Sequence, residues 1–325
     1  MKPKIEDVAK LAGVSPTTVS RVLNNRGYIG EKTRQKVDEA IKELNYYPNE
    51  VARSLFGKKT NLLGVIFPTT SNPFYGQLIF HLETLASSLG YKVLLCNSQG
   101  REDKEIEYLE MLQRHQVDGI IAGAHNEGIE AYSIPGLPVV GVDRYFSDTI
   151  PVVSSDNYEG GRLATELLIK RGCSTIIHIN GPISLKTPAN LRRKAYEDVM
   201  KEHELPHLTY EMESEETEER VLQQLFDANP KVDGIFASDD IIASKVLRVA
   251  KTKGIHIPNQ VKLIGYDGTE TQQLMLPELS TILQPIKLIA EKALDLLIKQ
   301  IEGGKEEIPY EVVLPITLLE SETTR

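Results

Sequence analysis

Cysteine is scarce in this 325-residue chain, and long apolar runs are absent. Cys96 and Cys173 lie far apart and match no metal-ligand spacing, so we expect two buried free thiols in a reducing compartment. No segment is long and apolar enough to span a bilayer. The N-terminal segment MKPKIEDVAK has no secretory apolar region, and we therefore expect a cytoplasmic protein that has no membrane partner.

Sequence signatures of enzymes are also missing. The chain has no glycine-rich phosphate loop of the Walker type, no GxSxG nucleophile elbow and no His/Cys metal spacing. Paired aspartates are present, but a binding cleft uses them as readily as an active site does. We therefore predict a binding protein that is not an enzyme and that needs neither a cofactor nor a metal.

Charge is divided unevenly along the chain, whose formal net charge is -9. Residues 1–60 hold 12 Lys and Arg against 7 Asp and Glu, whereas the remainder holds 25 against 39. A basic head on an acidic body predicts that only the head meets a polyanion such as DNA. The length of the chain also indicates more than one domain.

The first residues predict a compact helical head. The segment 5–24 (IEDVAKLAGVSPTTVSRVLN) indicates two short helices, the first ended by Gly13 and the second begun by Ser15 and Pro16. A third helix is expected from Glu31 to Leu44, with its apolar side covering the other two. The prediction is a helix-turn-helix whose second helix suits the DNA major groove, against the alternative of an ordinary helical hairpin.

Several independent motifs carry a more specific resemblance. DVAKLAGVSPTTVSRVLN is followed by EKTR, then by NYYPNEVARSL, and then by a strand that begins LLGVI. This succession resembles the LacI/GalR family of bacterial repressors along the whole chain. Arg21 would either pair with guanine or hold a phosphate, and only the first contact discriminates between sequences. The DNA-binding residues that the resemblance implies are Pro16, Thr17, Thr18, Ser20, Arg21, Asn24, Asn49, Ala52, Arg53 and Leu55.

Residues 49–56 (NEVARSLF) are expected to form a hinge helix barely two turns long, which is unstable alone in water. In the family such a helix folds when two copies meet over the operator. The resemblance implies that Leu55 then pries open a central base step from the minor groove. Ala52 fits this interpretation, because a small residue lets two hinge helices approach closely. The alternative is a plain linker with Leu55 buried on the core.

From Leu62 onward, short apolar segments rich in Val and Ile alternate with amphipathic helices. The alternation predicts an α/β fold with parallel sheets that helices cover on both faces. A long helix is expected at 286–302, followed by final strands near 311–319. The other expected strands are LLGVIF, YKVLLCN, VDGIIAG, PVVGVD, TIIHIN, VDGIFAS, VKLIGYD and LSTIL.

The resemblance implies that these units form a two-lobed core like that of periplasmic binding proteins, with three crossovers and a ligand cleft between the lobes. The crossovers are expected near Asn157, near Gln284–Pro285 and near Pro315. The expected domains are residues 1–46 as the helix-turn-helix DNA-binding domain, residues 47–60 as the hinge helix and linker, and residues 61–325 as the sugar-binding and dimerisation core. Its N-lobe would comprise about 61–157 and 286–315, and its C-lobe about 160–283 and 316–325.

Polar side chains follow the apolar strands, and parallel sheets bind ligands at the carboxyl ends of their strands. Carboxylates, guanidinium groups, amides and aromatic rings together suit a sugar, whose hydroxyls donate and accept while rings cover its C–H face. The expected ligand-binding residues are Asn72, Phe74, Tyr75, Asp143, Arg144, Arg192, Ser238, Asp239, Asp267 and Gln284.

Most of these residues resemble the ribose-binding branch of the fold. Ser238 before Asp239 departs from it, since that branch often has Asn there, and the shorter Ser implies a roomier pocket or a different sugar. Structural alternatives stay open as well. Arg144 would form a bridge to Asp143, Phe74 would belong to the core, and Asp239 is favoured as the cap of the following helix.

The segments SNPFY, VVSSDNYEGG, HINGP, KTPANLRRKAY and STILQP together resemble the sucrose operon repressors of low-GC Gram-positive bacteria. This resemblance implies fructose, sucrose or a phosphorylated form as the effector. Ribose, in a ribose-operon repressor, is the alternative. A stand-alone sugar-binding protein of the transport type is a remote alternative, against which the helix-turn-helix head argues.

The resemblance also implies a homodimer on a palindromic operator, released when a sugar closes the cleft. Purine-type relatives respond in the opposite sense with the same parts, so co-repression stays an alternative. The final residues LLESETTR contain no leucine heptad of the kind that makes tetramers in some relatives. We therefore expect a dimer.

Overall fold

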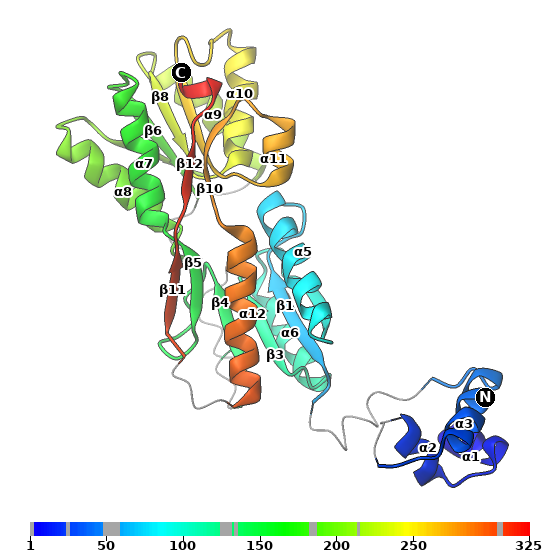
Figure 1. The fold of residues 1–325 in the computed structure, drawn as a ribbon. Helices are drawn as coiled ribbons and strands as arrows, with labels where there is room; N and C mark the ends of the chain where they lie inside the picture. The colour runs from blue at the N-terminus through cyan, green and yellow to red at the C-terminus, as the bar shows by residue number, and fades with distance from the viewer. Residues whose placement is uncertain are drawn as a thin grey trace. The chain divides into compact units, whose positions relative to one another are not determined.

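The computed structural model describes residues 3–23, 27–47, 59–123, 132, 136–181, 187–212, 215–303 and 308–325. The chain forms two compact units, residues 1–60 and 61–325, and each is described by itself (Figure 1). No described helix combines the length and the apolar character that crossing a membrane requires. Both cysteines are buried and neither is bridged.

The first unit contains three helices, α1 (Ile5–Ala12), α2 (Pro16–Leu23) and α3 (Glu31–Glu43). Helix α1 is capped at its C-terminal end by Gly13. The φ of Gly13 is 65°, a left-handed conformation that glycine adopts without steric strain. The Ser15 hydroxyl accepts a hydrogen bond from the backbone N–H of Thr18 at 3.1 Å and so caps α2. The predicted helix-turn-helix is present, and its small core consists of Val8, Ala9, Ala12, Val19, Val22, Val37 and Ala40.

The second unit is built on two six-stranded sheets, each with helices on both faces. The first sheet has the strand order β11-β5-β4-β3-β1-β2, and the second has the order β12-β10-β9-β8-β6-β7. All pairings are parallel except that of β10 with β12. The strands of the first sheet are β1 (Leu62–Phe67), β2 (Lys92–Asn97), β3 (Gly119–Ala122), β4 (Val139–Val142), β5 (Val152–Ser155) and β11 (Glu311–Leu314). Those of the second are β6 (Ile176–Asn180), β7 (Leu208–Glu211), β8 (Gly234–Ala237), β9 (Lys262–Asp267), β10 (Ser280–Leu283) and β12 (Thr317–Leu319).

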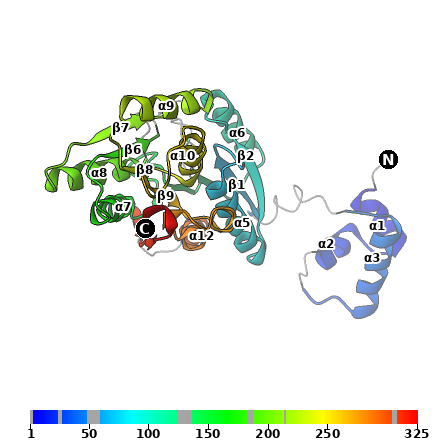
Figure 2. The same ribbon diagram turned by 90° about the horizontal axis from the view of Figure 1, so that it is seen from above.

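Helices cover both faces of each sheet, which keeps the central strands buried. In the N-lobe, α5 and α12 pack on one face and α6 on the other. In the C-lobe, α7 and α8 lie together opposite α9 and α10, with β6 and β8 between them (Figure 2). The helices are α5 (Pro73–Ser88), α6 (Glu102–Arg114), α7 (Asn157–Lys170), α8 (Asn190–Glu202), α9 (Glu215–Ala228), α10 (Asp240–Thr252), α11 (Glu270–Met275) and α12 (Ile286–Glu302), with a 3-10 turn at Glu322–Thr324.

The chain passes between the two sheets three times. It leaves the first sheet after β5, returns after β10 and leaves again between β11 and β12. These places match the crossovers expected from the sequence. Both lobes therefore depend on chain segments that are far apart in the sequence, and all three connections run beside the gap between the lobes.

Three short elements were not expected. The strand β5 has only four residues, β7 is an edge strand whose residues are all partly or fully exposed, and α11 has six residues. In β5 and β7 the apolar run that identifies a buried strand is too short or absent, and the six residues of α11 are too few to show a helical period. Their pairing partners or packing neighbours define them instead.

Candidate functional site

A cavity of about 240 Å³ lies between the lobes at the carboxyl ends of the strands. Nine of the ten predicted ligand-binding residues line it, and Arg144 does not. Both lobes contribute, since the cavity wall combines the β1–α5 turn and the end of β4 with segments after β6, β8, β9 and β10. The lining residues are Pro68, Asn72, Phe74, Tyr75, Asp143, Asn180, Gly181, Thr187, Ala189, Asn190, Arg192, Ser238, Asp239, Asp267 and Gln284.

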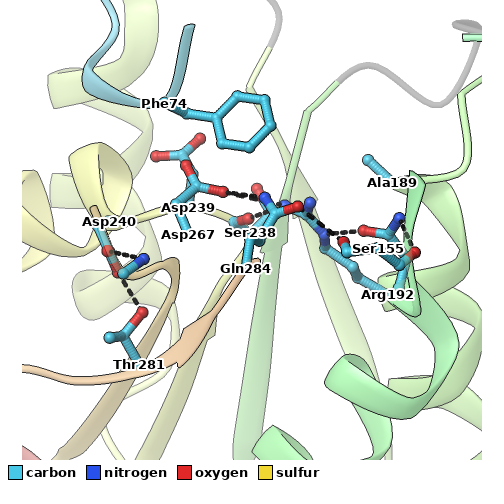
Figure 3. A network of polar contacts seen from close by, with 12 residues as sticks. Phe74, Ser155, Ala189, Arg192, Ser238, Asp239, Asp240, Asp267, Thr281 and Gln284 are labelled. Carbon is cyan, nitrogen blue, oxygen red and sulfur yellow. Dashed lines mark hydrogen bonds and ion pairs between the residues drawn. The ribbon is translucent and has the colours of Figure 1, made fainter. Parts of the chain in front are cut away.

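Asp267 is tied into a buried hydrogen-bond chain at the floor of the cavity (Figure 3). Gln284 donates its Nε2 to Asp267 Oδ1 at 2.7 Å, and Ser155 donates its hydroxyl to Gln284 Oε1 at 2.7 Å. Burial raises the pKa of Asp267 well above its ordinary value, an effect that the nearby Arg192 guanidinium opposes. The chain thus connects β5 of the N-lobe with β9 of the C-lobe.

Arg192 lies in the first turn of α8. Its side chain supplies the positive charge among the described residues that line the cavity. Its Nε donates to Asn157 Oδ1 at 2.7 Å and its Nη1 to the Ser238 carbonyl at 2.6 Å. The guanidinium carbon lies 3.6 Å from the centre of the Tyr266 ring, and Nη1 lies 3.9 Å from Asp267 Oδ1. This fixed plane beside a carboxylate is suited to hold sugar hydroxyls in one orientation.

Asp143 enters the cavity from the end of β4 with a φ of 50°, a left-handed conformation that Asp tolerates better than most residues. Its Oδ1 is buried and has no hydrogen-bond donor among the described residues. Burial raises the pKa of Asp143 to about 6, while Arg192 and the Asn157 amide act in the opposite direction. A buried acceptor of this kind calls for a donor such as a ligand hydroxyl.

Asp239 and its neighbour Asp240 act differently. Asp239 lines the cavity and also caps α10 by accepting the Ile242 N–H at 2.7 Å, so the capping alternative is confirmed and ligand binding stays a prediction. Asp240 accepts the Gly268 N–H at 2.8 Å and the Thr281 hydroxyl at 2.7 Å. By holding the turn that follows Asp267, Asp240 positions that carboxylate without lining the main cavity.

Aromatic rings form the N-lobe wall. The Asn72 side chain accepts the Phe74 N–H at 2.8 Å and so begins α5. Phe74 and Tyr75 follow with their ring centres 5.4 Å apart in an edge-on arrangement. Phe74 also belongs to the N-lobe core, which was its structural alternative. Helix capping therefore places an apolar surface against the polar groups of the opposite lobe.

Arg144 is the one predicted ligand-binding residue that does not line the cavity. Its residue is 2% exposed, and its guanidinium carbon lies 5.9 Å from the centre of the Phe146 ring, outside the cavity lining. Asp143 leaves β4 in a left-handed conformation and lines the cavity, whereas the buried side chain of Arg144 lies beside Phe146, which packs against the N-lobe core. The sequence shows that both follow the strand but not which of them turns inward.

The end of β6, the start of α8 and the segment that joins them supply lining residues that were not named in advance, including Asn180, Thr187, Ala189 and Asn190. Thr187 donates its hydroxyl to the Asp143 carbonyl at 2.7 Å, which joins the two lobes at the cavity wall. The signal was present, because this segment follows a buried strand. Its length prevented a choice of individual residues.

In the head, the predicted DNA-contacting side chains of α2 lie on its outer side. Pro16, Thr17 and Arg21 are exposed, and Thr18 and Ser20 are half-buried. The remaining predicted DNA-binding residues, Asn24, Asn49, Ala52, Arg53 and Leu55, lie outside the described residues.

Comparison with known families identifies both units. Residues 60–322 match the family described as periplasmic binding proteins and sugar binding domain of the LacI family, and residues 4–49 match the bacterial regulatory proteins of the lacI family. The chain belongs to the LacI family. This LacI-family member is a DNA-binding regulator with a sugar-binding core, and it is not an enzyme. No group of three or more His, Cys, Asp or Glu suited to a metal occurs in the described parts of this regulator.

Relatives of this LacI-family protein align over nearly its whole length. The sucrose operon repressor of Streptococcus mutans is 46% identical over 325 residues, which cover 99% of this chain and 100% of that protein. The ribose operon repressor of Halalkalibacterium halodurans is 40% identical over 322 residues, which cover 99% of this chain and 97% of that protein.

Solved structures resemble it as well. A LacI-type regulator from Alkaliphilus metalliredigens in complex with D-xylulofuranose has a TM-score of 0.74 and 35% identity, over 82% of this chain and 99% of that chain. The lac repressor dimer bound to operator and the anti-inducer ONPF has a TM-score of 0.87 and 25% identity, over 100% of this chain and 99% of that chain.

Proposed function

We propose that this LacI-family protein represses a sucrose-utilisation operon and leaves its operator when a sugar occupies the inter-lobe cavity. The observation that carries the proposal is the cavity itself, to which both lobes contribute hydrogen-bonding groups in a chain that begins with a helix-turn-helix. The similarity to the sucrose operon repressor of Streptococcus mutans supports the choice of operon. The protein would act in the cytoplasm as a homodimer on a palindromic operator, as the operator-bound lac repressor dimer suggests.

The chemistry of the cavity favours a small sugar. Asp143, Asp267 and Arg192 offer acceptors and donors for hydroxyls, and Phe74 offers an apolar face. A volume of about 240 Å³ is small beside the roughly 300–1,000 Å³ of pockets for drug-sized ligands. The related regulator bound to D-xylulofuranose supports a ketose in its five-membered ring form. Fructose fits this description better than intact sucrose.

A ribose operon repressor is the second candidate. It is favoured by the 40% identity to the ribose operon repressor of Halalkalibacterium halodurans, and by the resemblance of the predicted ligand-binding residues to the ribose-binding branch of the fold. Ribose is also small, uncharged and able to form a five-membered ring. The two candidates differ in the sugar and the operon and share the same cavity.

The response to sugar would be a population shift between lobe arrangements. A ligand that contacts both lobes binds one arrangement better than the other, and it can shift the equilibrium only by that difference. Coupling of this kind is typically on the order of 1–3 kcal/mol. The hinge roots would move with the N-lobe, so that the paired hinge helices separate and DNA is released.

Calorimetric titration of the full-length protein with fructose, sucrose, their phosphates and ribose tests the proposal. Each sugar that binds is then added to a gel-shift assay at fixed salt, with a duplex that the protein itself selects from random DNA, because affinity for DNA depends steeply on salt. Release by fructose or sucrose is the expected result. Release by ribose alone would move the protein to the second candidate, and a sugar that tightens DNA binding would reverse the proposed sign.

A further inference from the structure

Asp143 and Arg192 reach the cavity from opposite lobes. Asp143 directly follows β4 of the N-lobe, whereas Arg192 lies in the first turn of α8 in the C-lobe. The hydroxyls of a sugar ring are at fixed distances from one another. A sugar that bonds to both side chains therefore requires that the carboxylate and the guanidinium be held in one relative position.

Asn157 joins these two side chains without lining the cavity. It is the first residue of α7, just after the crossover from β5, and it is 1% exposed. Its Oδ1 accepts the Nε–H of Arg192 at 2.7 Å, and its Nδ2 donates to the Ser155 carbonyl at 3.0 Å. The same side chain also hydrogen-bonds to the Asp143 carboxylate. One buried amide thus touches a charged group of each lobe.

The partners of the Asn157 amide allow it only one orientation. A guanidinium donates and never accepts, so Arg192 must face Oδ1. The Ser155 carbonyl and the Asp143 carboxylate accept, so they must face Nδ2, which has one hydrogen for each of them. Aspartate would lack both donors, and serine would have a single hydrogen. The three contacts together therefore require an asparagine side chain.

The backbone fixes the distance between Asn157 and Arg192. Helices α7 and α8 meet closely at Gly161, where an added Cβ would lie 2.5 Å from the Arg192 carbonyl oxygen. An added Cβ at Gly160 would collide with the Tyr266 hydroxyl, and the Tyr266 ring carries the guanidinium on its face. The first turns of the two helices therefore form a rigid support for the amide and the guanidinium.

From these contacts we propose that Asn157 is a positioning residue for sugar binding, which holds Asp143 and Arg192 in the arrangement that the sugar requires. Asn157 acts through these two groups and touches no sugar atom itself. The inference rests on the proposed function, because it concerns the same cavity. Since Asn157 belongs to the first crossover, a change in the arrangement of the lobes would also change the spacing of the two charged groups.

Asn157→Asp tests the proposal with little change in size. A carboxylate is favourable at the start of a helix, so the fold should persist. The acceptor for Arg192 remains, but both donors are lost and a second carboxylate faces Asp143. Calorimetric titrations of the full-length protein with fructose and with ribose at pH 7.5 are expected to show affinity that is lower by roughly ten- to a hundred-fold. Affinity equal to that of the unaltered protein would overturn the proposal.

The pH profile of sugar binding separates positioning from a purely structural role. Burial raises the pKa of Asp143 to about 6, and the Arg192 guanidinium and the hydrogen bond from Asn157 oppose this rise. The phenol of Tyr75 also lies near, since burial and then the carboxylates of Asp143 and Asp267 raise its pKa. Without the bond from Asn157 the ionised form of Asp143 is less stabilised, so its pKa should rise further.

The affinity of the unaltered protein for sugar should therefore fall as the pH drops through about 6, where the acceptor on Asp143 becomes protonated. In Asn157→Asp the same loss is expected about one pH unit higher, the size that corresponds to one hydrogen bond to a charged group. A lower affinity with an unchanged midpoint would contradict the proposal and leave Asn157 a structural role.

Two further variants complete the test. Asn157→Ser keeps one hydroxyl hydrogen and should show a smaller change in the same direction, so the test does not depend on a single variant. Asn229→Asp is the matched control, because the Nδ2 of Asn229 donates to the Tyr210 hydroxyl at 2.8 Å and to the Leu225 carbonyl at 2.7 Å away from the cavity. It should bind sugar with unchanged affinity and midpoint. An equal loss in Asn229→Asp would assign the effect to lost stability, against the proposal.

The gel-shift assay distinguishes this inference from the proposed function. A sugar that releases the operator equally well from the unaltered protein and from Asn157→Asp would contradict the inference and leave the proposed function intact. A sugar that binds the unaltered protein far more tightly than Asn157→Asp, with the shifted midpoint, but leaves the operator bound would support the inference and contradict the proposed function.

Discussion

Arg192 and Arg193 are neighbours on α8 with different surroundings. Arg192 lines the cavity and is 6% exposed, whereas Arg193 pairs with Glu197 at 2.7 Å and with Glu211 at 2.8 Å away from it. Arg192 holds Asn157, the Ser238 carbonyl and the Tyr266 ring at once, which a lysine cannot do. The position of the guanidinium, more than its charge, therefore shapes the cavity.

Arg192→Lys is expected to weaken sugar binding by roughly ten- to a hundred-fold, because the charge stays but the oriented plane is lost. Calorimetry measures this change. Arg193→Lys is the matched control and should bind sugar normally. Equal affinities in the two variants would show that the sugar binds elsewhere.

Asp143 links the cavity to stability. Its folded-state pKa of about 6 lies above the ordinary value of 3.8, so the folded protein binds more protons than the unfolded chain between about pH 4 and pH 6. The free energy of unfolding therefore falls as the pH rises through this window. The cavity holds a carboxylate that is costly to bury until a ligand donates a hydrogen bond to it.

Asp143→Asn is expected to raise the free energy of unfolding of the sugar-free protein at pH 7.5 by on the order of 2 kcal/mol, because the neutral amide avoids the cost of burying a charge. Below about pH 4 the gain should vanish. Urea unfolding at several pH values measures it. Asp103→Asn is a control on the surface, where the pKa of Asp103 is lowered by Arg101. If the gain in the free energy of unfolding over the unaltered protein were no larger at pH 7.5 than at pH 4, the result would contradict this account.

Single residues also show which features of the cavity could be predicted from the sequence. Asp267 and Gln284 were predictable because Asp267 ends β9 and Gln284 directly follows β10, and both line the cavity. The role of Arg144 stays a prediction, because its buried side chain does not line the cavity although it directly follows Asp143. Asp240 was recognisable only as a neighbour of Asp239, because its partners Gly268 and Thr281 come from distant strands.

At the scale of elements, local signals identified helices and buried strands well. The long helix expected at 286–302 matches α12 in both bounds. The edge strand β7 was missed because its residues are all partly or fully exposed and form no apolar run. Helices and strands that local sequence stabilises can be predicted from the sequence, whereas an element that depends on pairing with a distant strand cannot.

The hinge at residues 49–56 is an element whose prediction rests on sequence alone, since it lies outside the described residues. Leu55→Ala is expected to weaken operator binding at least ten-fold, because alanine cannot replace the stacking lost at an opened base step. A gel-shift titration at fixed salt measures the change. Sugar affinity should stay unchanged in the same variant. Normal operator affinity would favour the plain linker.

At the scale of the whole molecule, the two units have separate cores and opposite charge balances. A protein comprising residues 61–325 alone is therefore expected to bind sugar with the affinity of the full-length chain and to lose operator binding. Calorimetry and the gel-shift assay measure the two activities. Operator binding that survives the removal of residues 1–60 would contradict the assignment of the head.

The sequence by itself determined the helix-turn-helix, the alternation of strands and helices and the kinds of groups in the cavity, whereas the three crossovers were expected from the family resemblance. Hydrophobic periodicity and helix capping act over a few residues, and they leave their mark in any short segment. Tertiary structure alone decided that Asp143 turns inward while Arg144 turns away, and that Arg192 is held by Asn157 and Tyr266. These outcomes depend on contacts between residues far apart in the chain, because burial and charge are settled only when both lobes close around the same space.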